Sequence, residues 1–173
     1  MNKSAIVIMA ACSVLCAFLC PGVSAKTTRA NEKAAIEKTI RASIGWALTK
    51  DRPLLESVLA HDDGLFMFQP DSKSTIVGWD QFAKQFDFWM DPRFKATTFD
   101  IRDLRINMSR SGDGAWWSCI LDDLGEWDGR PIGWKDTRWT GVLEKRDRKW
   151  IIVQMHFSFA EDAVRAEAAA SKK

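Results

Sequence analysis

The chain has 173 residues, and its 25 lysines and arginines nearly balance its 23 aspartates and glutamates. A protein that binds nucleic acid would present a basic surface, so this balance argues against a nucleic-acid partner. Nine tryptophans and ten phenylalanines, without any tyrosine, predict a core rich in aromatic rings.

The first 25 residues predict an export signal peptide rather than part of a fold. Lys3 supplies a positive start, Ala5–Leu19 an apolar run, and Val23–Ala25 a cleavage site of small residues. The run is short for a membrane span, and no later segment resembles one. We therefore expect cleavage after Ala25 and a periplasmic or secreted protein that has no membrane contact once the signal is removed.

Three of the four cysteines lie in this segment, which raises the alternative of a lipoprotein: Cys12, Cys16 and Cys20. Lipid attachment requires a small residue before the cysteine, but Cys16 and Cys20 follow leucine, so plain export is favoured. Cys119 alone remains in the mature chain, and its position on a strand predicts a buried thiol rather than a reactive one. With two distant histidines and one cysteine, the sequence predicts neither a metal site nor a cofactor.

Residues 26–160 have the size of a single domain with its own core. The first half is helical, with a first helix that starts at Asn31 and carries an apolar stripe every four residues. Asp51 and Pro53 predict the start of a second, shorter helix. A small hairpin over 65–77 and a third helix over 79–90 follow.

From Phe94 onward the periodicity becomes alternating, which predicts four long antiparallel strands. The apolar positions change from odd to even within the first of them, so we expect a β-bulge near Arg102-Asp103. The second strand covers 115–124, and the last two form a hairpin over 137–160. A helical tail, 161–173, ends the chain.

The final hairpin carries the most specific pattern. Arg138–Glu144 followed by Lys149–Ser158 resembles the last two strands of SnoaL-like domains, which belong to the nuclear transport factor 2-like superfamily. That superfamily includes ketosteroid isomerases and the association domain of calcium/calmodulin-dependent kinase II. The resemblance implies an α+β fold, in which three N-terminal helices pack on a strongly bent antiparallel sheet and form a cone with an open mouth.

We expect an apolar pocket inside this cone. The pocket arginines of the association domain correspond to Ser118, Gly141 and Phe157, and none is arginine here, so the resemblance implies that a charged pocket has become apolar. The predicted ligand-binding residues are Trp46, Trp79, Phe86, Trp89, Trp116, Ser118, Trp139, Met155 and Phe157. Alternation along the last strand also predicts one wholly apolar, pocket-lining face: Ile151, Val153, Met155, Phe157 and Phe159. For each aromatic ring, ordinary core packing is the alternative.

The strand 115–124 is apolar on both faces, and helices can cover only one of them. We expect the same sheet of a second subunit to cover the other face, which makes a homodimer. The predicted contact holds Trp117, Leu121, Arg138, Thr140, Gln154 and His156. We interpret His156 as part of a polar interface network rather than as a catalytic residue.

Three functions remain open at this point. The favoured one is binding of a small apolar, ring-containing molecule without chemistry. The second is a ketosteroid isomerase-like or hydratase/hydrolase-type enzyme that uses Asp122 for proton transfer, since a carboxylate among tryptophans would have a raised pKa. The usual donor tyrosine is missing, so a protonated acid or a tryptophan N–H would have to serve. The third is an interaction protein with a vestigial pocket.

Overall fold

The computed structural model describes residues 21–71, 73–162 and 164. Most of the predicted signal peptide and of the predicted C-terminal tail therefore lie outside the described residues. The first helix, α1 (Pro21–Gly45), runs through the predicted cleavage position after Ala25. Export and cleavage stay predictions. No helix within the described part of the chain is long and apolar enough to cross a membrane.

Four shorter helical segments follow α1: η1 (Trp46–Leu48), α2 (Arg52–Glu56), α3 (Trp79–Ala83) and α4 (Phe86–Trp89). The second predicted helix begins as expected, because the N–H of Leu54 donates to the Asp51 carboxylate at 3.1 Å and caps α2. The third predicted helix is two short helices instead of one. The N–H of Gln85 bonds to the carbonyl of Phe82, three residues back, and this tighter turn separates α3 from α4.

A six-stranded sheet forms the second half of the fold: β1 (Phe66–Phe68), β2 (Ile76–Val77), β3 (Phe94–Met108), β4 (Gly114–Trp127), β5 (Arg130–Arg146) and β6 (Lys149–Ser158). The strand order is β2-β1-β6-β5-β4-β3. The four long strands are antiparallel, as predicted, but β1 runs parallel to β6. The sheet is therefore mixed and not wholly antiparallel. Hairpin partners must be antiparallel, whereas β1 and β6 lie far apart in the sequence and can pair in either direction.

Extra residues in the long strands bend the sheet. The predicted bulge in β3 is confirmed between Arg102 and Arg105, where Asp103 has a φ of 53°. Three other bulges were not predicted, and the first of them lies in β3 at Thr97. The second lies in β5, where Asp136 has a φ of 52°, and the third lies in β6 at Val153. Each bulge exchanges the two faces of its strand from that point on.

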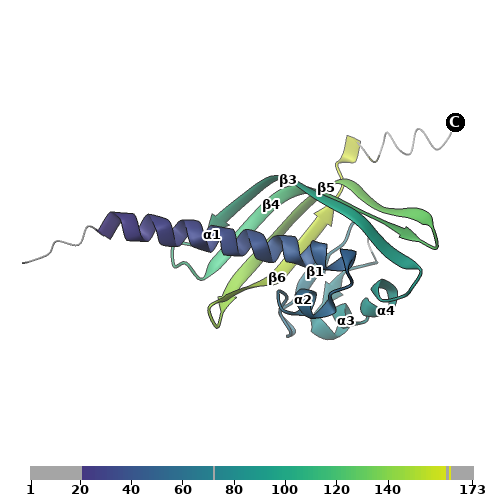
Figure 1. Ribbon diagram of the computed structural model, residues 1–173, viewed down its shortest axis with the longest axis horizontal. Helices are drawn as coiled ribbons and strands as arrows, with labels where there is room; N and C mark the ends of the chain where they lie inside the picture. The colour runs from purple at the N-terminus through teal and green to yellow at the C-terminus, as the bar shows by residue number, and fades with distance from the viewer. Residues whose placement is uncertain (1–20, 72, 163, 165–173) are drawn as a thin grey trace, which may run out of the picture.

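The helices and the sheet form two layers (Figure 1). The helix α1 crosses one face of the sheet and packs on β3 and β6, while α2, α3 and α4 gather at one end of it. We call the covered side the inner face and the opposite side the outer face. The carboxylate of Glu32 fixes α1 to the final hairpin, since it accepts from Trp150 Nε1 at 2.7 Å and from Lys145 Nζ at 2.5 Å.

The side chains of β4 point the other way from the prediction. Trp117 and Leu121 are 2% and 0% exposed in the core, whereas Trp116 is 48% exposed on the outer face. The placement of Trp117 and Leu121 at a dimer contact was therefore wrong. Both sets of side chains on this strand are largely apolar, so alternation separates them but does not say which set the helices cover.

The bulge at Val153 also divides β6. Trp150 and Ile152 point to the inner face before it, and Met155 and Phe157 point there after it. The single apolar face predicted for 151–159 is thus wrong in its first half, although Met155 and Phe157 lie where expected.

Candidate functional site

A cavity of about 450 Å³ lies on the inner face, between the short helices and the sheet. This volume is within the range of small-molecule sites. The helices α2, α3 and α4 all contribute side chains to its lining. The end of α1 and the start of η1 add Ser43, Ile44 and Trp46. The floor comes from β1, β3, β4, β5 and β6.

Seven aromatic rings line this cavity: Trp46, Phe82, Phe88, Trp89, Phe94, Trp134 and Phe157. Many of them are held by ring contacts to one another. Trp46 and Trp89 meet edge to face with centroids 5.6 Å apart, and Trp134 lies 5.5 Å from Phe157. Leu55, Met67, Leu124, Ile132 and Met155 complete the apolar lining.

The structure places some of the predicted ligand-binding residues in the cavity and others elsewhere. Trp46, Trp89, Met155 and Phe157 line it. Three rings lie in the packing behind the wall: Trp79 and Phe86 in the helical cluster, and Trp139 stacked on Phe157 at 5.7 Å. Trp116 and Ser118 are exposed on the outer face, so their placement in the pocket was wrong, for the reason given for β4.

Asp123, and not Asp122, is the carboxylate in the cavity. Its side chain points to the inner face of β4, like those of the odd-numbered residues before it. Its partners on the neighbouring strands are Phe99 on β3 and Trp134 on β5. The β5 bulge brings Trp134 to the inner face, because the inward positions of β5 change there from odd to even numbers. Two rings therefore flank the carboxylate.

The electrostatic environment of Asp123 is that of an isolated acid. It is the one ionisable side chain in the cavity lining of the described residues, and no hydrogen bond or ion pair to its carboxylate exists within them. Burial alone raises the pKa of Asp123 from its ordinary value of 3.8 to about 6. An acid of this kind can accept or donate a proton near neutral pH.

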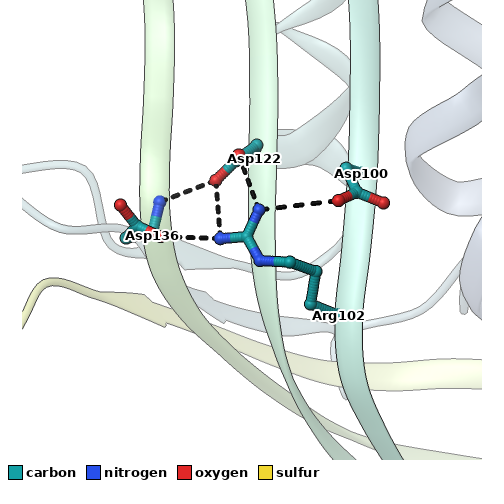
Figure 2. Close-up of polar contacts among 4 residues, drawn as sticks. All are labelled: Asp100, Arg102, Asp122 and Asp136. Atoms are coloured by element: carbon teal, nitrogen blue, oxygen red, sulfur yellow. Dashed lines mark hydrogen bonds and ion pairs between the residues drawn. The ribbon is translucent and has the colours of Figure 1, made fainter.

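Asp122 has the opposite environment on the outer face, where Figure 2 shows it within a network around Arg102. Arg102 donates to both carboxylate oxygens of Asp122, at 2.7 and 3.2 Å, and reaches Asp136 at 2.6 Å and Asp100 at 3.5 Å. The N–H of Asp136 also donates to Asp122 at 2.7 Å. These hydrogen bonds lower the pKa of Asp122, and the bond from Arg102 has the largest effect. The expectation of a raised pKa at Asp122 was therefore wrong.

The network has a structural consequence. Asp100 and Arg102 stand on β3, Asp122 on β4 and Asp136 on β5, so one guanidinium ties three strands together. It does so next to the bulges at Asp103 and Asp136, where the sheet bends. Asp122 therefore stabilises the bend on the side away from the cavity.

The two histidines lie outside the cavity lining. His156 is on the outer face, opposite Thr140 on β5, with its ring centroid 5.8 Å from that of Phe68. His61 stacks on Trp79 at 3.7 Å. Cys119 is buried and free, as predicted, and burial raises the pKa of its thiol to about 12. In the described ranges no group of three His, Cys, Asp or Glu side chains is arranged to hold a metal ion.

The family of this domain follows from its similarity to known proteins. Residues 36–162 match the family model of the SnoaL-like domain. The chain belongs to the SnoaL-like domain family. This confirms the resemblance that the final hairpin indicated. No curated protein matches the chain.

Solved structures similar to this SnoaL-like protein include three with the same architecture. An NTF2-like protein with a cystatin-like fold from Novosphingobium aromaticivorans has a TM-score of 0.64 at 14% identity, over 86% of this chain and 94% of its own. A candidate scytalone dehydratase from the same species has a TM-score of 0.64 at 13% identity, over 76% of this chain and 86% of its own. A candidate ketosteroid isomerase from Shewanella frigidimarina has a TM-score of 0.55 at 19% identity, over 72% of this chain and 94% of its own. At these identities the likeness shows the fold alone.

Sequence reasoning missed Asp123, although a signal for it was present. The adjacent acids Asp122 and Asp123 must point to opposite faces of a strand, so only one of them can reach the cavity. Arg102 lies at the predicted bulge of the neighbouring strand, and its pairing with Asp122 would have placed that acid on the exposed side. The choice of Asp122 followed from the wrong face of β4.

Proposed function

We propose that this SnoaL-like protein binds a small, largely apolar, ring-containing molecule in its cavity. The observation that carries the proposal is the aromatic wall around a space of about 450 Å³ with a single carboxylate in it. A flat hydrophobic molecule gains both apolar burial and ring stacking in such a site. Gln69 and Gln85, which also line the cavity, supply amide groups that can orient a polar substituent.

Filling the cavity tests this proposal. Ile132 lines the cavity from β5, so Ile132→Trp places an indole in the ligand space. An apolar fluorophore that binds the unmodified protein, and that ring compounds displace, should bind this variant at least about tenfold more weakly. Ile120→Trp is the matched control, because Ile120 lies on the outer face of β4. Equal binding to all three proteins would show that the ligand does not occupy this cavity.

The alternative function is proton transfer by Asp123, as in an isomerase or a hydratase/hydrolase-type enzyme. The observation in its favour is the raised pKa of about 6, which suits an acid or base that works near neutral pH. Asp123→Asn should then retain binding of a substrate and lose turnover, while Asp122→Asn should keep both. A candidate substrate that Asp123→Asn still converts at the original rate would exclude this role.

The homodimer and the export are also proposals. The outer face carries a continuous row in the register Trp116, Val142, Gln154, Phe66 and Val77 across five strands. Trp116, Val142 and Val77 are 48%, 39% and 51% exposed, and such a largely apolar row supports a contact between two sheets. Amino-terminal sequencing of the exported protein tests the cleavage after Ala25.

A further inference from the structure

The cavity combines an aromatic wall with one unpaired negative charge. We propose that its ligand is an organic cation, with a quaternary or protonated ammonium group held against Asp123 and an apolar body held among the aromatic rings. This inference rests on the proposed binding function and names the chemical class of the ligand.

The first argument is the missing partner of Asp123. Buried carboxylates are nearly always paired, since an ionised carboxylate out of water loses more free energy than neighbouring apolar groups return. Asp122, one residue earlier, is fully paired, whereas Asp123 has no partner among the described residues. A bound cation supplies the missing charge from outside the chain.

The second argument is the composition of the wall. Tryptophan is the ring that attracts cations most strongly, and Trp46, Trp89 and Trp134 all line the cavity. The rings of the neighbouring helical cluster already hold a cation, because the guanidinium of Arg52 lies 4.2 Å from the ring centroid of Phe86. An ammonium group in the cavity would gain ring contacts in addition to the carboxylate.

The third argument concerns what the cavity excludes. No lysine, arginine or histidine belongs to its lining in the described chain, so an anionic ligand would meet Asp123 without a compensating charge. The nearest charged positions in the register of the flanking strands are Asp100 and Arg102 on β3 and Lys135 and Asp136 on β5. Asp100, Lys135 and Asp136 are exposed, and Arg102 is bound to Asp122 on the outer face. The charge of Asp123 therefore dominates the cavity.

A pair of compounds with the same shape tests the inference. Phenyltrimethylammonium and tert-butylbenzene differ in one atom and in the positive charge, and their binding can be measured by displacement of an apolar fluorophore. We expect the cation to bind at least about tenfold more tightly than the hydrocarbon at pH 8, through the ion pair and the ring contacts. Ile132→Trp should weaken the binding of both compounds.

The charge of Asp123 gives two controls. In Asp123→Asn the preference for the cation should fall to about threefold or less, while Asp122→Asn should keep it unchanged. In the unmodified protein the preference should also fall when the pH is lowered through about 6, because the carboxylate becomes protonated. The pH series needs no variant and so does not depend on the folding of Asp123→Asn.

The outcomes separate this inference from the proposed function. If both compounds bind equally well at pH 8 and Ile132→Trp weakens both, the cavity binds ring compounds but the ligand is not a cation. If neither compound nor the fluorophore binds, the proposed binding function is wrong as well. A preference for the cation that survives in Asp123→Asn would place the cation elsewhere and overturn the inference.

Discussion

Asp122 and Asp123 are neighbours in the sequence with opposite chemical environments. Asp122 accepts hydrogen bonds from Arg102 and from the N–H of Asp136, and its pKa is lowered. Asp123 faces aromatic rings, and burial raises its pKa to about 6. The same substitution should therefore have opposite effects on stability at the two positions.

Asp123→Asn should stabilise the protein above pH 6, because it removes a buried charge. A pKa raised from 3.8 to about 6 corresponds to a loss of up to about 3 kcal/mol when the carboxylate is ionised. The native state binds this proton at a higher pH than the unfolded chain does, so the unmodified protein regains stability as the pH falls from 6 to 4. Urea unfolding of both proteins at pH 4 and pH 8 measures the difference. A variant that is less stable than the unmodified protein at pH 8 would contradict it.

Asp122→Asn should destabilise the protein at neutral pH by about 1 kcal/mol, since it weakens the pairing with a partly exposed Arg102. A carboxylate with a lowered pKa contributes its stability above the pKa of the unfolded chain and loses it as the pH falls through the folded value. The difference between the two proteins should therefore shrink as the pH falls below 3.8, the ordinary pKa of an aspartate. High salt should also reduce it. An unchanged urea midpoint at pH 7 would show that the network of Figure 2 contributes nothing.

At the scale of elements, the inner face depends on close packing between strands. Gly141 on β5 lies under the ring of Trp117 on β4, and a Cβ at Gly141 would come within 2.5 Å of the carbonyl oxygen of Gln154. The association-domain resemblance placed a pocket arginine at this position. Trp117 fills that space here, so the pocket of this chain lies farther along the sheet, around Asp123.

Gly141→Ala should destabilise the protein by about 2–3 kcal/mol or more, because neither the indole nor the strand backbone can move away cheaply. Gly114→Ala is the matched control at the start of β4, where the added Cβ would meet Ser109 at an ordinary 3.6 Å. Thermal unfolding of the two variants should show a large loss for the first and a small change for the second. Equal losses would mean that close strand packing does not explain the effect.

At the scale of the whole molecule, the two faces of the sheet lie in different environments. The inner face holds the core and the cavity, and the outer face carries Trp116 and its apolar row. Because Leu121 is buried in the core, a charge there would unfold the chain and would not report on assembly. Trp116 is the residue of β4 that tests the proposed dimer.

Trp116→Arg should convert the proposed dimer into a monomer without loss of folding, since the side chain is 48% exposed in the single chain. A contact of ordinary size buries about 800 Å² on each partner, and an unpaired charge buried in it disrupts it. Sedimentation velocity at micromolar concentration gives the two masses, and circular dichroism gives the folded state. An unmodified protein that sediments as a monomer would rule the dimer out.

The sequence by itself determined the α+β class, the four long antiparallel strands, the helix cap at Asp51 and the bulge beside Arg102. These features depend on local periodicity and on residues that act on their own backbone, which a sequence displays directly. It also identified three rings of the cavity wall: Trp46, Trp89 and Phe157.

Only the tertiary structure decided which face of each strand points inward. Alternation divides the side chains of β4 into two sets, but both sets are apolar, and the helices that cover one of them are distant in the sequence. The bulges at Asp136 and Val153 then exchange the faces of β5 and β6 without a clear local signal. For this reason the acid in the cavity is Asp123, while Asp122, one residue away, binds Arg102 on the opposite side of the sheet.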